Sequence, residues 1–332
     1  MEAVAIVLLN YNGKGLLKRF IPQLVENSDQ HPIYLIDNGS SDDSIDWVKN
    51  NYASIHCILL TENLGYAEGY NKGLKQIKAS LYILLNTDVW VTKNWIAPML
   101  DHFKSHPNTA IAQPHIVDYT NKTYFEYAGA AGGFIDQYGF PYCRGRIFKH
   151  LEKDNGQYNV KARVFWASGA CFFVRRSVFE DLGGFDAAFF AHQEEIDLCW
   201  RAQRNGLAIY AIGDSKVYHL GGGTLRQSAT KIYLNHRNSL YLLIKNLPSK
   251  QLFATLLVRI LLDGLAGVFY FIQGKWSYTM AIIRAHVAFY KNSASFFRQR
   301  PKSIPKHNYF RVKSIVFEHY LRGIKNFDHL KH

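Results

Sequence analysis

Residues 3–13 read Ala-Val-Ala-Ile-Val-Leu-Leu-Asn-Tyr-Asn-Gly, an apolar and β-rich run that ends at a polar turn. Such a run is typical of a strand buried on both faces of a sheet. Further short apolar runs at 33–36, 55–60 and 81–85 alternate with stretches of helical spacing. The stretch that follows residues 63–65 is expected to form a helix to about residue 79. This alternation predicts an α/β fold in which helices flank a mostly parallel sheet.

Three of these predicted strands end in polar clusters, at residues 10–13, 37–42 and 86–88. In open α/β sheets, ligands bind beyond the carboxyl ends of the strands. We therefore expect the three clusters to line one crevice, although Asn, Asp, Gly and Ser are also ordinary turn residues. We also expect Ser40 or Ser41 to cap the helix that follows the second cluster.

Two strand ends offer metal ligands. Asp88 ends the fourth predicted strand, and His219 ends a later one, beside glycines 221–223. A carboxylate oxygen together with an imidazole nitrogen suits Mn²⁺ and tolerates Mg²⁺.

Glu194, Glu195 and Asp197 open a helix predicted over residues 194–205. Carboxylates are favourable at a helix N-terminus, so simple terminal charge is one explanation. Three acids in four residues also repel one another, which raises the pKa of at least one of them and suits a general base.

The middle of the chain is harder to interpret. Between residues 108 and 165 the sequence shows no regular periodicity. After it we expect a buried strand ending near residue 174, a short helix over 175–181, and two short strands at 208–211 and 216–218.

Charge is distributed unevenly along the 332 residues, whose net charge is +13. Residues 1–222 contain 21 basic and 23 acidic residues, whereas residues 223–332 contain 18 basic and three acidic ones. The last third is therefore expected to bind something anionic, either a lipid surface or nucleic acid. The four cysteines form no C-x-x-C pair, which favours reduced thiols over a zinc ribbon or a disulfide scaffold.

Residues 252–272 form an apolar stretch long enough to span a bilayer. It contains Arg259 and Asp263, four residues apart, and both are costly inside lipid. We therefore favour a helix that lies in or against the membrane interface over a true span or a soluble core helix. The following aromatic and basic residues suit a headgroup surface, or alternatively a solvated helical surface over the catalytic domain; the aromatic ones are Trp276, Tyr278, Phe289, Tyr290, Phe296 and Phe297.

Together, the motifs resemble those of family 2 glycosyltransferases with a GT-A fold, and especially the bacterial rhamnosyltransferase-like branch that builds cell-surface polysaccharides. The motifs are Ile6–Gly13, Ile36–Asp42, Asn63–Gly73, Leu84–Asp88, Ser168–Ala170, Gly183–Asp186, Glu194–Arg201, and His219 with Gly221 and Gly222. The resemblance covers roughly residues 3–225. It implies a glycosyltransferase domain over 1–225 and a helical membrane-associating region over 226–332.

The resemblance also implies a role for each site residue. Glu195 would be the general base, with Glu194 as the alternative. Asp88 and His219 would hold Mg²⁺ or Mn²⁺ on the diphosphate, and Asp37 would bind the nucleobase or ribose. The residues expected to bind nucleotide or substrate, or to support those that do, are Leu9, Asn10, Tyr11, Asp37, Asn38, Gly65, Asn71, Asn86, Thr87, Ser168, Gly169, Asp197 and Arg201.

Two positions depart from the family pattern. Asn86 replaces the first acid of the D-x-D motif, so Asp88 is the charged ligand of that loop. Glu195 stands where the usual base is Asp, so its longer side chain must reach the same point.

The implied activity is transfer, with inversion, of a sugar from a UDP- or dTDP-sugar to a hydroxyl of a glycan or polyprenyl-linked glycan. The implied location is the cytoplasmic face of the bacterial inner membrane, peripheral or monotopic, against an anionic lipid surface. One alternative is a catalytically weak scaffold subunit, which Asn86 favours. Another is a nucleic-acid-binding protein that uses the basic tail, but the tail shows no recognition motif, so no nucleic-acid partner is expected.

Overall fold

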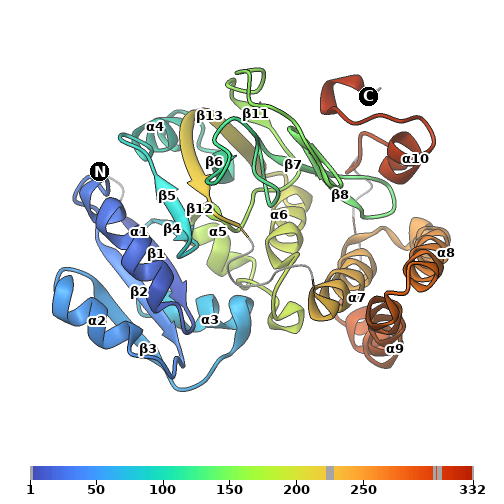
Figure 1. The fold of residues 1–332 in the computed structure, drawn as a ribbon, viewed down its shortest axis with the longest axis horizontal. Helices are drawn as coiled ribbons and strands as arrows, with labels where there is room; N and C mark the ends of the chain where they lie inside the picture. The colour runs from blue at the N-terminus through green and yellow to red at the C-terminus, as the bar shows by residue number, and fades with distance from the viewer. Residues whose placement is uncertain (1–2, 222–227, 302–303, 305–308, 331–332) are drawn as a thin grey trace.

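A nine-stranded sheet forms the centre of the protein, in a computed structural model that describes residues 3–221, 228–301, 304 and 309–330. The strand order is β11-β13-β6-β12-β4-β1-β2-β3, and β5 pairs with β13 (Figure 1). Strands β3, β2, β1 and β4 run parallel, as do β6 and β13, whereas β12 is antiparallel to both of its neighbours. The predicted mostly parallel α/β sheet is therefore confirmed. The strands are β1 (Val4–Asn10), β2 (Ile33–Asn38), β3 (His56–Leu60), β4 (Leu81–Leu85), β5 (Val89–Val91), β6 (Thr109–Asp118), β11 (Ala162–Arg163), β12 (Cys171–Arg175) and β13 (Ala208–His219).

Helices cover both faces of this sheet, because its strands are apolar on both sides. Along β1, Ile6 and Leu8 belong to one hydrophobic core, and Ala5 and Val7 belong to the other. Helices α1 (Lys14–Glu26), α2 (Ser44–Asn51) and α4 (Ala97–Ser105) cover the first face, and α3 (Gly65–Leu74), α5 (Arg176–Asp181) and α6 (Glu194–Arg204) cover the second.

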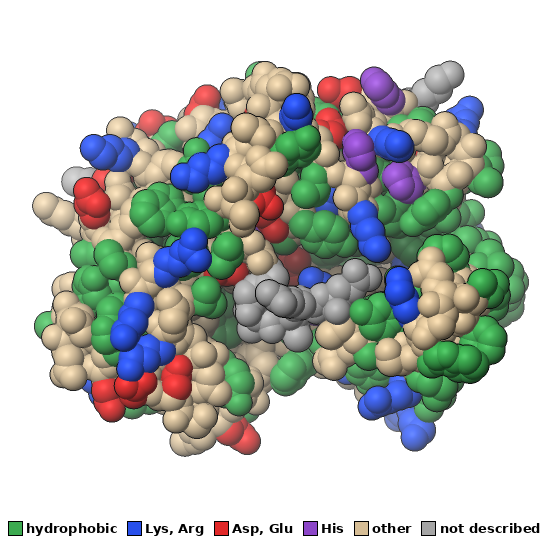
Figure 2. All heavy atoms as spheres, in the orientation of Figure 1, with side chains coloured by type: hydrophobic (Ala, Val, Ile, Leu, Met, Phe, Trp, Pro, Cys, Tyr) green, Lys and Arg blue, Asp and Glu red, His purple; other side chains and the backbone are tan. Residues whose placement is uncertain are grey.

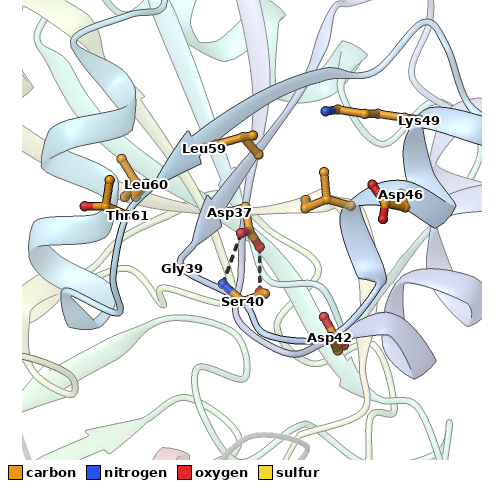
Figure 3. A pocket seen from close by; sticks show the side chains of 10 residues that line it. Asp37, Gly39, Ser40, Asp42, Asp46, Lys49, Leu59, Leu60 and Thr61 are labelled. Carbon is orange, nitrogen blue, oxygen red and sulfur yellow. Dashed lines mark hydrogen bonds between the residues drawn. The ribbon is translucent and has the colours of Figure 1, made fainter.

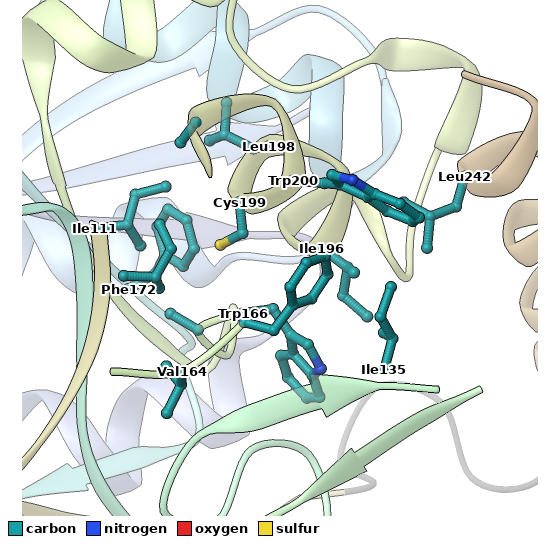
Figure 4. Close-up of a cluster of buried hydrophobic side chains, with 14 of the residues drawn as sticks. Ile111, Ile135, Val164, Trp166, Phe172, Ile196, Leu198, Cys199, Trp200 and Leu242 are labelled. Atoms are coloured by element: carbon teal, nitrogen blue, oxygen red, sulfur yellow. The ribbon is translucent and has the colours of Figure 1, made fainter. Parts of the chain in front are cut away.

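The second core continues into the C-terminal helices. Trp200 of α6 and Leu242 of α7 (Ala229–Asn246) lie in one buried cluster with Phe172 of β12 (Figure 4). Burial of large apolar side chains across this junction stabilises the position of α6 against the sheet. The predicted boundary at residues 225 and 226 falls outside the described part of the chain.

The segment with no sequence periodicity contains two structures that we did not predict. Strand β6 is buried along nearly its whole length, although Gln113, Pro114 and His115 interrupt its apolar pattern. A small antiparallel sheet follows it, composed of β7 (Gly133–Ile135), β8 (Pro141–Cys143), β9 (Arg146–Ile147) and β10 (His150–Leu151). These strands are too short for alternation to be visible in sequence.

Three local expectations were wrong. Ser40 does not cap α2, because its backbone N–H and its hydroxyl both donate to the Asp37 carboxylate, and Ser41 donates to Asn12 instead. The two strands predicted after α6 form the single strand β13, which has an irregularity between Ile212 and Lys216. Helix α3 ends at Leu74, earlier than its predicted end near residue 79.

The C-terminal region is helical, as expected, with α7 packed against α9 and α8 (Figure 1). Arg259 Nε lies 2.9 Å from Asp263 Oδ1, and both residues are buried. His236 and His286 also contact Asp263, so these polar groups face inward, toward α7 and α9. The remaining elements are α8 (Ser249–Ile272), α9 (Trp276–Arg298), α10 (Ile315–Tyr320) and the 3-10 turns Ala187–Phe189 and Phe327–His329.

The aromatic residues of α9 divide between two faces. Trp276, Tyr290 and Phe297 are exposed, as a headgroup surface requires. Phe289 and Phe296 are instead buried against Tyr241 of α7, so the expectation that all of them face a membrane was wrong.

Candidate active site

Asp37 lies at the end of β2, beside Asn10 at the end of β1. Asn10 Nδ2 donates to Asp37 Oδ1 at 3.0 Å, and the Ser40 N–H donates to Asp37 Oδ2 at 3.1 Å (Figure 3). These bonds fix the carboxylate at one side of a cavity of about 340 Å³. Its lining residues are Asp37, Gly39, Ser40, Asp42, Ile45, Asp46, Lys49, Leu59, Leu60 and Thr61.

Asn38 connects the end of β2 to the start of α3. Its side chain donates to the Gly65 carbonyl at 3.0 Å and accepts from the Leu64 N–H at 3.0 Å. Gly65 has a φ of +77°, and a Cβ there would lie 2.5 Å from the ring of Phe190. Gly65 therefore allows the loop before α6 to approach α3 closely.

Asp88 and His219 come together because β13 pairs with β5. In this pairing His219 lies opposite Val89, the residue after Asp88. His219 Nε2 lies 3.1 Å from Asp88 Oδ1, and both side chains are buried. Glu126, which sequence reasoning missed, lies on the other side of the ring, with Oε1 3.2 Å from His219 Nδ1. Burial lowers the pKa of His219, but the Glu126 and Asp88 carboxylates more than offset this and raise the pKa to about 10.

The donor set fits a divalent ion that is shared with a diphosphate. In the described ranges, no group of three or more His, Cys, Asp or Glu side chains is arranged to hold a metal ion. Asp88 and His219 offer two donors, and Mg²⁺ or Mn²⁺ bound to phosphates needs few protein ligands. With a pKa of about 10, His219 is protonated and donates from Nδ1 to Glu126 and from Nε2 to Asp88; a divalent ion bound at Nε2 would take the place of that proton.

Glu194 and Glu195 stand at the start of α6, where Glu194 is buried and Glu195 is partly buried. The Oε2 atom of each has no hydrogen-bond partner. Burial raises the pKa of Glu195 to about 7, and burial together with the neighbouring carboxylate raises the pKa of Glu194 further. The pair therefore favours a protonated Glu194 beside a Glu195 that ionises near neutral pH.

The loop before these two acids has an unusual backbone. Phe190, His192 and Gln193 all have positive φ, between 63° and 71°. Asn238 of α7 stabilises this loop, because its Nδ2 lies 2.7–3.0 Å from the carbonyl oxygens of residues 189, 191 and 192. Gln193 also donates to Ser239 at 2.9 Å. Helix α7 thus determines where α6 begins.

Asp197 and Arg201 form a buried network that ties α6 to α7. The Asp197 carboxylate accepts from Arg201, Lys245 and Asn246 at 2.8–2.9 Å. Burial raises the pKa of Asp197, but Lys245 and Arg201 lower it well below its usual range. Arg201 also donates to the carbonyl oxygen of Gly184 at 2.8 Å. This geometry favours support of the helix over contact with substrate.

Ser168 and Gly169 lie between the predicted metal loop and α3. The Ser168 N–H donates to Gln113, and the Gly169 carbonyl accepts from the Tyr66 hydroxyl at 2.9 Å. The Glu194 and Glu195 carboxylates, besides burial and Tyr70, raise the pKa of Tyr66, so this phenol connects the 168–169 turn with the two acids. The Asn86 N–H donates to the Ala170 carbonyl at 3.0 Å, which places the metal loop on the same turn.

The other predicted site residues differ in how exposed they are and in which groups they contact. Tyr11 is exposed near the end of β1, whereas Leu9, Asn86 and Thr87 are partly buried. The Asn71 amide is engaged by Phe185, donating to its carbonyl oxygen and accepting from its N–H. That engagement favours a structural role for Asn71.

In sequence, the chain is similar to known glycosyltransferases. The glycosyl transferase family 2 model matches residues 5–183, more than half of the chain. The N-acetylglucosaminyl-diphospho-decaprenol L-rhamnosyltransferase of Mycobacterium tuberculosis is 24% identical over 254 residues, which cover 72% of this chain and 83% of the relative. The low-salt glycan biosynthesis hexosyltransferase Agl10 of Haloferax volcanii is 25% identical over 245 residues, covering 72% and 74%.

Two solved structures share the fold. GalNAc-T7 with UDP, GalNAc and Mn²⁺ has a TM-score of 0.56 at 15% identity, over 73% of this chain and 48% of that one. The mannosyltransferase PcManGT of Pyrobaculum calidifontis, in complex with GDP-Man and Mn²⁺, has a TM-score of 0.52 at 12% identity, over 89% and 76%. The fold is thus of the GT-A type, and the chain belongs to glycosyl transferase family 2 as a rhamnosyltransferase-like enzyme.

Proposed function

We propose that the protein is a metal-dependent, inverting glycosyltransferase that moves a sugar from a UDP- or dTDP-sugar to a hydroxyl of a lipid-linked glycan. The observation that carries this proposal is the Glu195 carboxyl. It is partly buried, has a buried oxygen without a hydrogen-bond partner, and has a pKa that burial raises to about 7. A general base of this pKa is half ionised at neutral pH and can accept a proton from a hydroxyl.

The donor would bind across the carboxyl ends of β1, β2 and β4. The cavity beside Asp37 has the size and polarity for a base and ribose, and Asp37 can accept hydrogen bonds from either. Asp88 and His219 would hold Mg²⁺ or Mn²⁺, and the ion would neutralise charge on the departing nucleoside diphosphate. Glu126 would keep the His219 ring in the tautomer and orientation that metal binding requires.

In the transfer step, Glu195 takes the proton of the acceptor hydroxyl. The hydroxyl oxygen forms a bond to the anomeric carbon while the bond from that carbon to the diphosphate oxygen breaks, which inverts the configuration. Glu194, held protonated, reduces the repulsion that a second carboxylate would create. Tyr66 and Asn238 keep the acids in place through α3 and the loop before α6.

The C-terminal helices would attach the enzyme to a membrane that contains its acceptor. Among the described residues, α8 is the one helix long and apolar enough to cross a bilayer. Its charged pair faces inward, so the outer face is apolar without a buried charge in lipid. That face and the adjoining face of α9 suit insertion into one leaflet, beside basic residues that attract anionic headgroups. Figure 2 shows hydrophobic side chains gathered over α8, at the right of the view. The large exposed side chains of these two faces, on α8 and α9, are Phe253, Leu257, Leu261, Leu265, Val268, Phe269, Phe271, Ile272, Trp276, Met280, Ile283, Val287, Tyr290 and Phe297.

Binding of nucleoside diphosphates, followed by calorimetry with and without Mn²⁺, tests the donor site. UDP or dTDP should bind in a Mn²⁺-dependent way, and Asp88→Asn should remove that dependence. Glu195→Gln should retain the binding but lose sugar transfer. Binding that is equally strong without metal, or transfer by Glu195→Gln, would contradict the proposed mechanism. Glu180→Gln, at an exposed position of α5, is the control for loss of a carboxylate.

Flotation with lipid vesicles tests the membrane site. Wild-type protein should float with vesicles rich in anionic phospholipid, and the pair Leu261→Ser and Leu265→Ser should reduce flotation. Val160→Ser removes an equally exposed apolar side chain outside these helices and should have no effect. Equal flotation of all variants would exclude this face as the attachment site.

A further inference from the structure

Arg146 carries a buried positive charge close to the active site. It lies in β9 of the small sheet and is 5% exposed. Its two Nη atoms donate to the Phe148 carbonyl and to the Cys143 sulfur, both at 3.3 Å, whereas its Nε has no partner. Within the described part of the chain it forms no salt bridge. A buried guanidinium without an ionic partner is costly, so it favours a site that an anion completes.

Arg146 and a second cation, Lys231, both lie against the ring of Tyr127. The Arg146 guanidinium carbon is 4.8 Å from the centre of the Tyr127 ring, and Lys231 Nζ is 5.9 Å from it. Lys231 belongs to the first turn of α7, an 18-residue helix that begins after the Ser228 cap. The positive end of the helix dipole therefore adds to the two side-chain charges.

Glu126 links Arg146 and Lys231 to Asp88 and His219, the proposed metal ligands. Its Oε1 atom lies 3.2 Å from His219 Nδ1, and burial lowers the pKa of Lys231 although the Glu126 carboxylate opposes this shift. Arg146 donates to Cys143, and burial raises the pKa of the Cys143 thiol with a further contribution from the Glu195 carboxylate, so the cluster lies on the side of the proposed base.

The opposite side of the cluster is apolar. Ile232 and Tyr233, which follow Lys231, pack against Ala266 and Tyr270 of α8. Burial raises the pKa of Tyr270, and the nearby Tyr127 adds to this shift. A ligand for such a position would have an anionic group joined directly to a hydrocarbon chain.

We propose that Arg146 and Lys231, positioned against Tyr127, form a subsite for the diphosphate of a prenyl-diphosphate-linked acceptor. This inference rests on the proposed function, since it extends the acceptor side of the same site. The glycan would then point toward Glu195 and the prenyl chain toward α8. A guanidinium and an ammonium group are both suited to binding phosphate oxygens. The donor is the other source of a diphosphate, but its site lies between Asp37 and Asp88.

Farnesyl diphosphate is the probe for this subsite, with EDTA present so that the metal-dependent donor site does not contribute. Calorimetry should detect binding to the wild-type chain. Arg146→Gln and Lys231→Gln should each weaken it about tenfold or more, while Mn²⁺-dependent binding of UDP stays unchanged. Arg144→Gln is the matched control, because Arg144 is as buried but donates to the Ala131 carbonyl and lies over Tyr158. It should bind farnesyl diphosphate as the wild type does.

Several outcomes would overturn the subsite. If the wild type does not bind farnesyl diphosphate, or if neither variant weakens binding, Arg146 and Lys231 only balance the charge of Glu126. If the variants weaken UDP binding and leave farnesyl diphosphate unaffected, the cations belong to the donor. Lys231→Gln carries the test if Arg146→Gln does not fold, since Lys231 is only partly buried. If the wild type binds farnesyl diphosphate but no nucleoside diphosphate, the proposed function is refuted, and Arg146 and Lys231 form a prenyl diphosphate site without a role in binding an acceptor.

Discussion

Replacing Glu195 by glutamine should abolish transfer and at the same time stabilise the fold. Burial raises the pKa of the Glu195 carboxyl from the ordinary 4.5 to about 7, so its ionised form destabilises the folded state. Glutamine has nearly the same shape and remains neutral at every pH. The substitution also removes a negative charge from beside Glu194. The gain in stability should therefore follow the ionisation of the carboxyl that was removed.

The sign and size of this effect come from linkage between ionisation and folding. A carboxyl whose pKa is raised on folding contributes no penalty below its unfolded pKa of 4.5, and the penalty grows as the pH rises through about 7. The difference between these two values corresponds to about 3 kcal/mol in the free energy of unfolding. We therefore expect the free energy of unfolding of Glu195→Gln to exceed that of the wild type by about 3 kcal/mol at pH 8 and by close to zero at pH 4.

Urea denaturation followed by tryptophan fluorescence, at several values between pH 4 and pH 8, measures this difference. Glu180→Gln is the control, because the Glu180 carboxylate is exposed and pairs with Arg176 at the surface. It should change the urea midpoint little at any pH. An equal gain for Glu195→Gln at pH 4 and pH 8, or a loss at pH 8, would refute the reasoning. An equal gain would mean that the pKa of Glu195 does not change on folding, and a loss at pH 8 would mean that the folded protein stabilises the Glu195 carboxylate.

Three further substitutions test the packing around the site. Asn238→Ala leaves carbonyl groups of the loop before α6 unpaired, and it should lower the free energy of unfolding by about 2–4 kcal/mol in urea denaturation and reduce kcat more than nucleotide binding. Asp197→Ala leaves Lys245 and Arg201 without their buried partner, at a cost of about 3–5 kcal/mol by the same assay. Gly133→Ala places a Cβ 1.9 Å from the Trp166 ring, so the thermal midpoint should fall and tryptophan fluorescence should change.

Much of the donor side of the site was predictable from local sequence. Asn10 and Asp37 follow apolar strands, and parallel strands must end at one edge of the sheet, so their contact follows from the order of elements. The position of Asp88 beyond the carboxyl end of a strand was predictable for the same reason. His219 was predictable as a strand end, but its pairing with Asp88 depends on the register of β13 against β5.

The acceptor side was not predictable in this way. Glu126, Tyr127 and Arg146 lie in the segment without periodicity, where short strands and turns leave no repeat to detect. The functions we propose for them arise from contacts with residues far away in the chain, such as His219 and Lys231. No spacing rule connects such positions, because the distance between them is set by how separate elements pack.

The amino-acid sequence by itself determined the order of strands and helices, the polar ends of the strands, the acids at the start of α6 and the basic, apolar character of the last third. These properties depend on neighbouring residues, through periodicity, capping and charge. Only the tertiary structure decided which carboxylates are buried without partners, which histidine nitrogen faces Asp88, and that the charged pair of α8 faces inward. Burial and pairing depend on groups that are distant in sequence, and they set the pKa values and the exposed surfaces on which the proposed chemistry depends.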